Sequence, residues 1–172
     1  MSLQIRLAQP QDIAQLMAVE RSAAQLFRQQ PAWRFIAEGP VMSADRHADF
    51  IQRQHEWLAE STAGEVAGFI AVVPQSQDWH IAELSVGANW QRQGIGRRLL
   101  IEVAAQAALL GAQRLTLTTF IDVPWNAPYY RRLGFMPIAA ERLSPSLRAG
   151  LAEEVAQGFA AGSRCAMEFT LS

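Results

Sequence analysis

The chain has 172 residues, half of them apolar and 18% charged, which suits one compact domain with a normal core and no need for disulfides or metals. Its formal net charge of −1 gives no basic field, so neither nucleic-acid nor membrane binding is indicated. No apolar run approaches the roughly 20 residues of a membrane helix, the opening residues lack a secretory pattern, and the single cysteine, Cys165, fits a reducing compartment. We therefore expect a cytoplasmic protein.

The first half of the chain predicts a strand, two helices and a group of strands. Residues 4–8 alternate like a strand, and apolar residues recur at helical spacing from Asp12, which can cap that helix. Segment 27–42 holds aromatic residues and prolines without a clear period and predicts an irregular loop or broken helix. A second helix is expected over 44–56. Extended segments separated by turn residues predict an antiparallel meander, with strands at 57–60, 66–73 and 80–86.

The second half predicts helices that alternate with strands. Residues 94–110 carry an apolar stripe at helical spacing, and Gly111 supplies a helix stop. Ser144 followed by Pro145 predicts the start of a further helix, to about residue 157. The other expected elements are a strand over 114–119, a short helix over 126–133, a strand over 135–140 and a strand over 164–171. This order predicts a mixed α/β domain around one sheet.

The most informative stretch is residues 86–99, where a predicted strand ends and two glycines open a helix. Gly94 and Gly96 let the backbone approach a bulky phosphate, and the N–H groups of the helix start favour an anion. Mobile positive charge is added by Arg92, Arg97 and Arg98. The pattern predicts an anion site.

Three interpretations of this stretch compete. A dinucleotide-binding turn needs a third glycine, but Leu99 stands there, and no acidic residue follows on a strand at the expected distance. A nucleotide-triphosphate loop needs Gly-Lys-Ser or Gly-Lys-Thr, which is absent from the sequence. The two glycines alone also fit a solvated turn, so they do not decide the ligand.

A family resemblance rests on two segments. Residues 91–96, Gln-Arg-Gln-Gly-Ile-Gly, resemble the Gln/Arg-x-x-Gly-x-Gly/Ala signature of the GNAT superfamily of acyl-CoA-dependent N-acyltransferases. Downstream, residues 126–135 resemble its second signature, an Asn, then an aromatic-Tyr pair, then Gly-Phe. The resemblance implies one N-acetyltransferase domain over 1–172, with residues 141–172 a variable C-terminal helix and strand. The implied fold is α/β, with a mixed, mostly antiparallel central sheet flanked by helices and splayed between the fourth and fifth strands.

The resemblance also implies a donor site for acetyl-CoA as co-substrate, with no metal. Pantetheine would pair with the backbone of Leu84, Ser85 and Val86, because a splayed strand offers C=O and N–H groups to its amides. Asn126 would contact the pantetheine or its thiol end, and Arg132 is a weaker candidate for the adenosine end. The pyrophosphate would be held by N–H groups of Gln91, Arg92, Gln93, Gly94, Ile95, Gly96 and Arg97.

Two catalytic roles follow from the resemblance and the chemistry. Tyr130 matches the family's general acid, since a phenol of pKa about 10 can protonate a thiolate of pKa about 8.5. The amine must first lose a proton, and His80 and Glu83 are candidate bases on the preceding strand, with a water chain as the alternative. Three residues apart, they point to opposite faces of a regular strand. We favour Glu83, because the family often has an acidic residue on this strand.

The resemblance predicts an N-acetyltransferase that transfers acetyl directly, in a ternary complex, to the amine of a small molecule or protein. The alternative is a non-catalytic acyl-CoA-binding regulatory module on the same fold. Cys165 is expected to be a small core residue rather than a nucleophile. Asp122 could pair with an ammonium group or cap a turn, and the sequence leaves a homodimer open. Candidates for the acceptor wall are Phe27, Trp33, Phe35 and Trp125.

Overall fold

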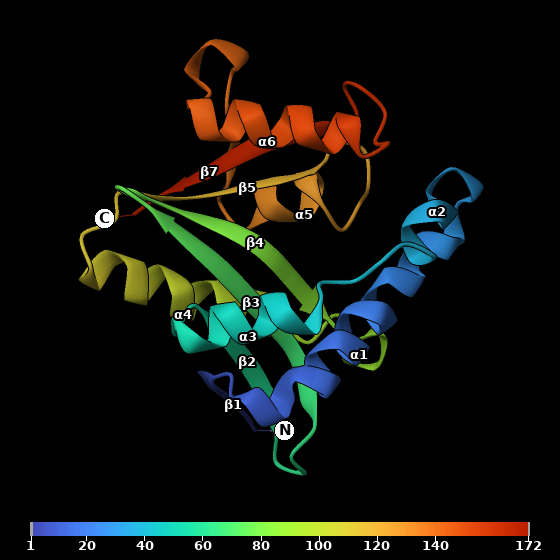
Figure 1. The fold of residues 1–172 in the computed structure, drawn as a ribbon, viewed down its shortest axis with the longest axis vertical. Coiled ribbons are helices and arrows are strands. Elements are labelled where there is room, and N and C mark those ends of the chain that lie inside the picture. The colour runs from blue at the N-terminus through green and yellow to red at the C-terminus, as the bar shows by residue number, and fades with distance from the viewer. Residues whose placement is uncertain (1, 172) are drawn as a thin grey trace. The chain divides into compact units, whose positions relative to one another are not determined.

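The computed structural model describes residues 2–171, and they form two compact units: residues 2–73 with 81–106, and residues 74–80 with 107–171. Figure 1 follows the chain through both. The strands are β1 (Leu3–Leu7), β2 (Glu56–Ser61), β3 (Val66–Gln75), β4 (Asp78–Val86), β5 (Arg114–Phe120), β6 (Met136–Pro137) and β7 (Arg164–Thr170). The helices are α1 (Ile13–Ala24), α2 (Arg34–Ala37), α3 (Ala44–Gln52), α4 (Ile95–Leu109), α5 (Ala127–Arg132) and α6 (Pro145–Ala156).

The strands of the described residues join in one sheet of order β1-β2-β3-β4-β5-β7-β6. The pairs β1–β2, β2–β3, β5–β7 and β6–β7 are antiparallel, whereas β4 and β5 are parallel. The β4–β5 register runs from Asp78–Arg114 to His80–Thr116, and the division into units falls directly after His80. The expected mixed, mostly antiparallel sheet is confirmed, and the sheet was expected to open between these two strands.

The first unit buries both faces of its central strands. Phe69 of β3 packs with Leu16 of α1 and Ile51 of α3 in one apolar cluster. Figure 1 shows α1 and α3 on the same side of β2 and β3. The neighbouring Gly68 points to the other face, where an added Cβ would lie 2.8 Å from the Ser85 carbonyl oxygen and 3.3 Å from the Ile95 side chain. Glycine therefore lets β3 lie close to the end of β4 and the first turn of α4.

A buried polar pair lies within the first unit. The Nδ1 atom of His47 is 2.8 Å from Oε2 of Glu56, and both side chains are fully buried. Burial raises the pKa of the Glu56 carboxyl, although the His47 hydrogen bond opposes the shift. Nearby, Glu20 accepts the N–H of Met42 at 2.9 Å, and burial again raises its pKa. Glu56 is part of the buried core of this unit, and Glu20 is a partly buried acid that is also desolvated.

The second unit combines β5, β6 and β7 with α5 and α6. In Figure 1, α6 crosses β7 within this unit, and Leu147 of α6 packs with Ile138 and Ala166. Ser144 caps α6 by accepting the N–H of Leu147 at 3.1 Å, which confirms the helix start expected there. Phe135 lies 5.7 Å from the Tyr130 ring centroid, so α5 is also tied to this core.

Several predicted boundaries need correction. The helix expected over 44–56 ends at Gln52, because Glu56 already belongs to β2. The strand expected over 135–140 is short, Met136–Pro137, and a 3-10 turn follows at Ala140–Arg142. Asp12 does not cap α1: its carboxylate accepts the N–H of Gln9 at 2.7 Å and forms an ion pair with Arg6 at 2.9 Å. That pairing lowers the pKa of Asp12.

The segment expected to be irregular is a series of short helical pieces. It comprises 3-10 turns at Gln25–Gln29 and Pro31–Trp33, followed by α2. Over residues 2–171, none of the helices combines the length and apolar character that crossing a membrane would require.

Candidate active site

The loop between β4 and α4 is shaped by positive backbone angles at alternate residues. Arg92 has φ of 63° and Gly94 has φ of 75°, whereas Gln91 has φ of −67°. Successive residues of opposite hand direct their N–H groups toward one point, which is a geometry that binds anions. The Gln91 side chain donates from Nε2 to the Val86 carbonyl at 2.6 Å and so closes the loop onto the end of β4.

The start of α4 adds N–H groups to this loop. The first turn of a helix has N–H groups without helical partners, and the bond that closes the first turn of α4 runs from Arg98 N–H to the Gly94 carbonyl at 3.1 Å. Gly94 is exposed, so a bulky group can approach the backbone there. The positive end of the helix dipole also favours a negatively charged group at this position. This fits the anion site that the sequence predicts.

The loop is anchored at its base by hydrogen bonds to two other elements. The N–H of Gly87 donates to the Ala67 carbonyl at 2.9 Å, and the N–H of Ala88 donates to the Ser22 hydroxyl of α1 at 2.9 Å. The loop therefore starts from a fixed position on β3 and α1.

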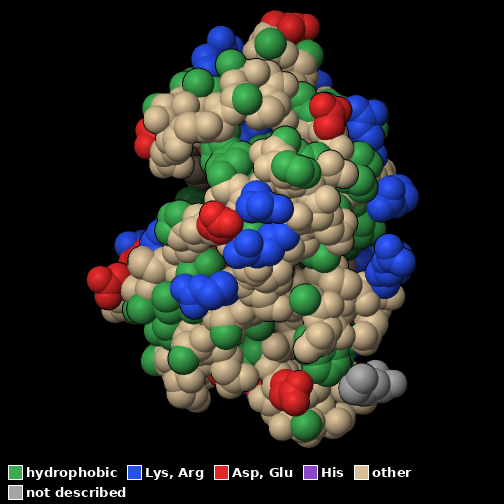
Figure 2. Space-filling view, turned by 90° about the vertical axis from the view of Figure 1, so that its right-hand side faces the viewer, with side chains coloured by type: hydrophobic (Ala, Val, Ile, Leu, Met, Phe, Trp, Pro, Cys, Tyr) green, Lys and Arg blue, Asp and Glu red, His purple; other side chains and the backbone are tan. Residues whose placement is uncertain are grey.

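The three arginines expected around the loop differ in their contacts. All three are exposed, but the Arg98 side chain donates to the Leu3 carbonyl at 2.9 Å and is held at β1. Figure 2 shows Arg side chains on one face as separate groups with Asp and Glu among them, not as a continuous basic field. The positive charge that can reach a ligand at the loop is thus local and comes from Arg92 and Arg97.

The end of β4 also carries a polar pair. Ser85 is buried and donates its hydroxyl to Oε1 of Glu83 at 3.0 Å. Residues two apart share a face of a strand, so Glu83 lies on the face of Ser85. Glu83, Leu84, Ser85 and Val86 all belong to the first unit, together with the loop.

Asn126 and Tyr130 lie together in the second unit, at the start of α5. The Asn126 carbonyl accepts the N–H of Tyr130 at 2.9 Å, which begins the helix. The Thr119 hydroxyl donates to Oδ1 of Asn126 at 2.7 Å, so the amide NH2 is the part of this side chain that can donate to a ligand. The Tyr130 ring contacts those of Tyr129 and Phe135, with centroids 5.4 and 5.7 Å away.

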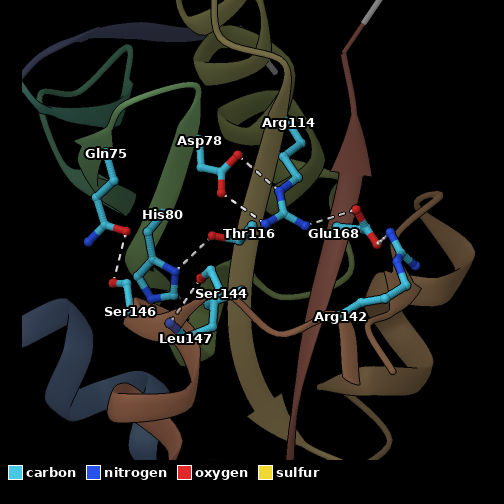
Figure 3. A network of polar contacts seen from close by, with 10 residues as sticks. All are labelled: Gln75, Asp78, His80, Arg114, Thr116, Arg142, Ser144, Ser146, Leu147 and Glu168. Atoms are coloured by element: carbon cyan, nitrogen blue, oxygen red, sulfur yellow. Dashed lines mark hydrogen bonds and ion pairs between the residues drawn. The ribbon is translucent and has the colours of Figure 1, made fainter. Parts of the chain in front are cut away.

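His80 is held by the neighbouring strand. It pairs in register with Thr116, and Nδ1 lies 2.9 Å from the Thr116 hydroxyl oxygen. Arg114, two residues before Thr116 on β5, donates two hydrogen bonds of 2.9 Å to Asp78 and a third, of 3.0 Å, to Glu168 of β7. Figure 3 shows this network across β4, β5 and β7. Arg114 therefore fixes the strand register that brings His80 to Thr116.

The surroundings of His80 favour its neutral form. Burial lowers the pKa of His80 below its ordinary value, although the Glu154 and Asp78 carboxylates oppose the shift. A neutral imidazole has one nitrogen that accepts a proton. His80 thus has the protonation state that a general base needs near neutral pH.

Sequence reasoning missed the threonines of β5. Thr116 and Thr119 are almost fully buried and hold His80 and Asn126, while Thr118 donates to Glu154 of α6 at 2.7 Å. Their density in the Leu-Thr-Leu-Thr-Thr run was the available signal, since a buried hydroxyl needs a partner. The partners themselves lie far away in sequence and could not be inferred.

The residues expected at the acceptor wall differ in their surroundings. Phe27 and Trp33 contact each other, with ring centroids 6.4 Å apart, whereas Phe35 is about half exposed. Trp125 is partly buried and Asp122 is exposed. In the outer part of α5, the Arg132 guanidinium lies over the Tyr129 ring, 5.9 Å from its centroid.

Two further features concern the single cysteine and the side chains that can bind metal ions. Burial raises the pKa of the Cys165 thiol, which disfavours the thiolate that a nucleophile requires. Within the described part of the chain, no cluster of three or more His, Cys, Asp or Glu side chains could hold a metal ion.

Comparison with protein families gives a match to the model described as "Acetyltransferase (GNAT) family", over residues 20–135. That range contains the loop before α4 and the segment that holds Asn126 and Tyr130.

Solved structures with the same fold cover the whole chain at low sequence identity. A PaiA N-acetyltransferase from Thermoplasma acidophilum, in complex with coenzyme A, is 18% identical with a TM-score of 0.73, and the match covers 99% of both chains. N-acetylglutamate synthase from Neisseria gonorrhoeae, with coenzyme A and N-acetyl-glutamate, is 19% identical with a TM-score of 0.76, over 100% of this chain and 36% of that one. The ribosomal-protein-S18-alanine N-acetyltransferase from Escherichia coli is 18% identical with a TM-score of 0.67, over 99% and 95%.

Proposed function

Because the chain belongs to the acetyltransferase (GNAT) family, we propose that it transfers the acetyl group of acetyl-CoA directly to an amine acceptor in a ternary complex. The observation that carries this proposal is the loop before α4. Its alternating positive backbone angles and the helix start that follows make an anion site of backbone N–H groups, suited to a pyrophosphate.

In this proposal the first unit binds the donor. The N–H groups of residues 91–97 bind the pyrophosphate, Arg92 and Arg97 add charge, and the backbone of Leu84, Ser85 and Val86 pairs with the pantetheine amides. Asn126 is proposed to donate its amide NH2 to the pantetheine or its thiol end, since Thr119 already occupies its oxygen.

We propose that His80 removes the proton of the acceptor ammonium. Its lowered pKa keeps the imidazole neutral. With the ring proton on Nδ1 and donated to the Thr116 hydroxyl, Nε2 is the nitrogen that accepts the proton of the ammonium. Glu83, favoured by the sequence alone, is the competing base, but its carboxylate already accepts the Ser85 hydroxyl. Comparing turnover of His80→Gln with that of Glu83→Gln decides between them.

Tyr130 is the proposed general acid. When the amine attacks the thioester carbon, the C–S bond breaks and the departing thiolate takes the phenol proton. The contacts with Tyr129 and Phe135 hold the ring in a defined orientation, which this role requires.

We propose that the two compact units together form one acetyltransferase domain.

The acceptor is an amine of a small molecule or a protein. The names of two similar structures indicate acceptors of both kinds. One is N-acetylglutamate synthase bound to N-acetyl-glutamate, and the other is named for an alanine of a ribosomal protein. The test is release of CoA thiol from acetyl-CoA across a panel of amino acids, aliphatic amines, polyamines and peptides. We expect release that depends on one class of amine, with the acetylated amine as product by mass spectrometry.

The outcome separates an enzyme from a regulatory module. Binding of acetyl-CoA with no amine-dependent release across the panel would contradict the enzyme and favour the acyl-CoA-binding module. All fifteen basic residues of the chain are arginines. Acetylation of its own lysine side chains therefore cannot be mistaken for turnover.

A further inference from the structure

A small pocket with hydrogen-bonding groups in its lining adjoins the proposed base in the second unit. It has a volume of about 190 Å³ and lies between the end of β3, the start of β4, the middle of β5 and the side of α6. Figure 3 shows His80 and Ser146 extending into the same region, beside Gln75 and Leu147. The pocket is lined by Gln75, His80, Thr118, Ser146, Leu147, Gly150 and Glu154.

The lining is hydrogen-bonding and nearly neutral. The Ser146 hydroxyl donates to Gln75 at 3.1 Å. The Glu154 carboxylate accepts from the Thr118 hydroxyl at 2.7 Å and from Arg164 at 2.6 Å, so its charge is already compensated. Hydroxyl and amide groups of this kind suit a ligand that itself carries hydroxyls or amides, whereas an alkyl chain would desolvate them without compensation.

Gly150 leaves part of this pocket open without a packing reason. A glycine inside a helix is less stable than alanine by roughly 0.5–1 kcal/mol, and a Cβ added at Gly150 would meet no heavy atom within 4 Å. Packing alone would therefore favour a larger residue. At roughly 30 Å³ per water-sized group, the pocket has space for about six such groups, the size of a small polar amine.

We propose that this pocket receives the hydrogen-bonding part of the acceptor and that Gly150 sets the size of the acceptor that fits. The substrate class is then a small aliphatic primary amine bearing hydroxyl or amide groups, with its amine at His80. This inference rests on the proposed acetyltransferase function, because His80 connects the pocket to the reaction.

The size of the pocket is tested with Gly150→Leu, and the control is Ala152→Leu at an exposed position of the same helix. With serinol as acceptor, we expect Gly150→Leu to lower kcat/KM at least about tenfold, with the KM for acetyl-CoA unchanged. Ala152→Leu should change neither value. Equal kcat/KM for serinol in Gly150→Leu and the wild type would overturn the proposal.

The chemistry of the pocket is tested with amines of the same number of non-hydrogen atoms: serinol, pentylamine and putrescine. We expect Ser146→Ala to lower kcat/KM for serinol several-fold, and to leave that for pentylamine unchanged. Comparing each amine with itself in the two proteins removes differences in intrinsic reactivity. An equal effect on all three amines would contradict a hydrogen-bonding site.

A binding measurement keeps this inference separate from the proposed function. Titration with serinol, followed by NMR at the Gly150 amide and the His80 ring, should give saturable shifts in the wild type and none in Gly150→Leu. No shift at Gly150 in the wild type would overturn the pocket, even if amine-dependent thiol release with other acceptors supported the enzyme. Shifts without any thiol release would support the pocket and count against the enzyme.

Discussion

The loop before α4 and the groups around β5 differ in what they are made of. The loop, in the first unit, is built from backbone: positive angles at Arg92 and Gly94 and the N–H groups of a helix start. The groups around β5, in the second unit, are side chains held by other side chains: His80 by Thr116, Glu154 by Thr118 and Asn126 by Thr119.

This difference suits the two proposed tasks. Binding a pyrophosphate needs several fixed donors and no proton transfer, so backbone suffices. Removing and returning protons needs titratable groups of set pKa and orientation, so side chains with partners are required. Substitutions in the loop should therefore lower donor affinity, whereas substitution of His80 should lower turnover.

The largest effect is expected from Gly94→Glu. A carboxylate would repel the pyrophosphate, and a side chain at φ of 75° is strained. Like charges at an interface cost several kcal/mol, so CoA affinity measured by calorimetry should fall about 100-fold or more. The matched control is Gly111→Glu, where φ is 85° and the surroundings are also open. If both variants bind CoA as the wild type does, the loop is not the donor site.

The next largest effect is expected from His80→Gln, which removes the proposed base but keeps a hydrogen-bonding side chain. We expect kcat to fall about 100-fold, with CoA affinity unchanged. Glu83→Gln, on the other face of β4, is the comparison and should lower kcat far less. The reverse order of the two effects would assign the base to Glu83.

A smaller loss is expected from Tyr130→Phe, which keeps the ring contacts and removes the phenol proton. Turnover should fall roughly tenfold or more, while CoA affinity stays near that of the wild type. Steady-state kinetics with donor and acceptor varied separately would measure both. Unchanged turnover would remove Tyr130 from the mechanism.

The smallest effect is expected from Glu20→Gln, and it concerns stability only. Burial raises the pKa of Glu20 in the folded state above its value in the unfolded state. The contribution of this group to the free energy of unfolding is therefore fully present below the unfolded-state pKa, and it is lost as the pH rises through the folded-state pKa. His47, Arg46 and Glu56 are the titratable groups that act on it. Urea unfolding against pH should show that Gln removes this decline. At neutral pH we expect the free energy of unfolding of Glu20→Gln to exceed that of the wild type. The difference should lie near the lower end of the range of about 0.5–3 kcal/mol that is usual for single substitutions.

Turnover and CoA affinity should not change in Glu20→Gln. A loss of CoA affinity in this variant would mean that the buried acids of the first unit also position the loop. No difference from the wild type in the pH dependence of stability would contradict the role of burial at this carboxyl.

The two regions also differ in how far the sequence predicted them. The order of strands and helices and the loop at 91–96 follow from local patterns, because hydrophobic periodicity and glycines act over a few residues. The surroundings of His80 do not follow from such patterns. Thr116 reaches it only through the parallel β4–β5 register, and the Glu154 carboxylate, which raises the His80 pKa, lies on α6. The predicted capping role of Asp12 was wrong because its carboxylate pairs with Arg6, which lies on another element, β1.

The most direct test of the division of tasks is the pH dependence of turnover with acceptor saturating. If His80 removes the proton, kcat falls on the acidic side with an apparent pKa below the ordinary histidine value of about 6.5. This limb should vanish in His80→Gln, while CoA affinity stays constant over the same pH range in both proteins. A limb that persists in His80→Gln, or a CoA affinity that follows it, would contradict the account.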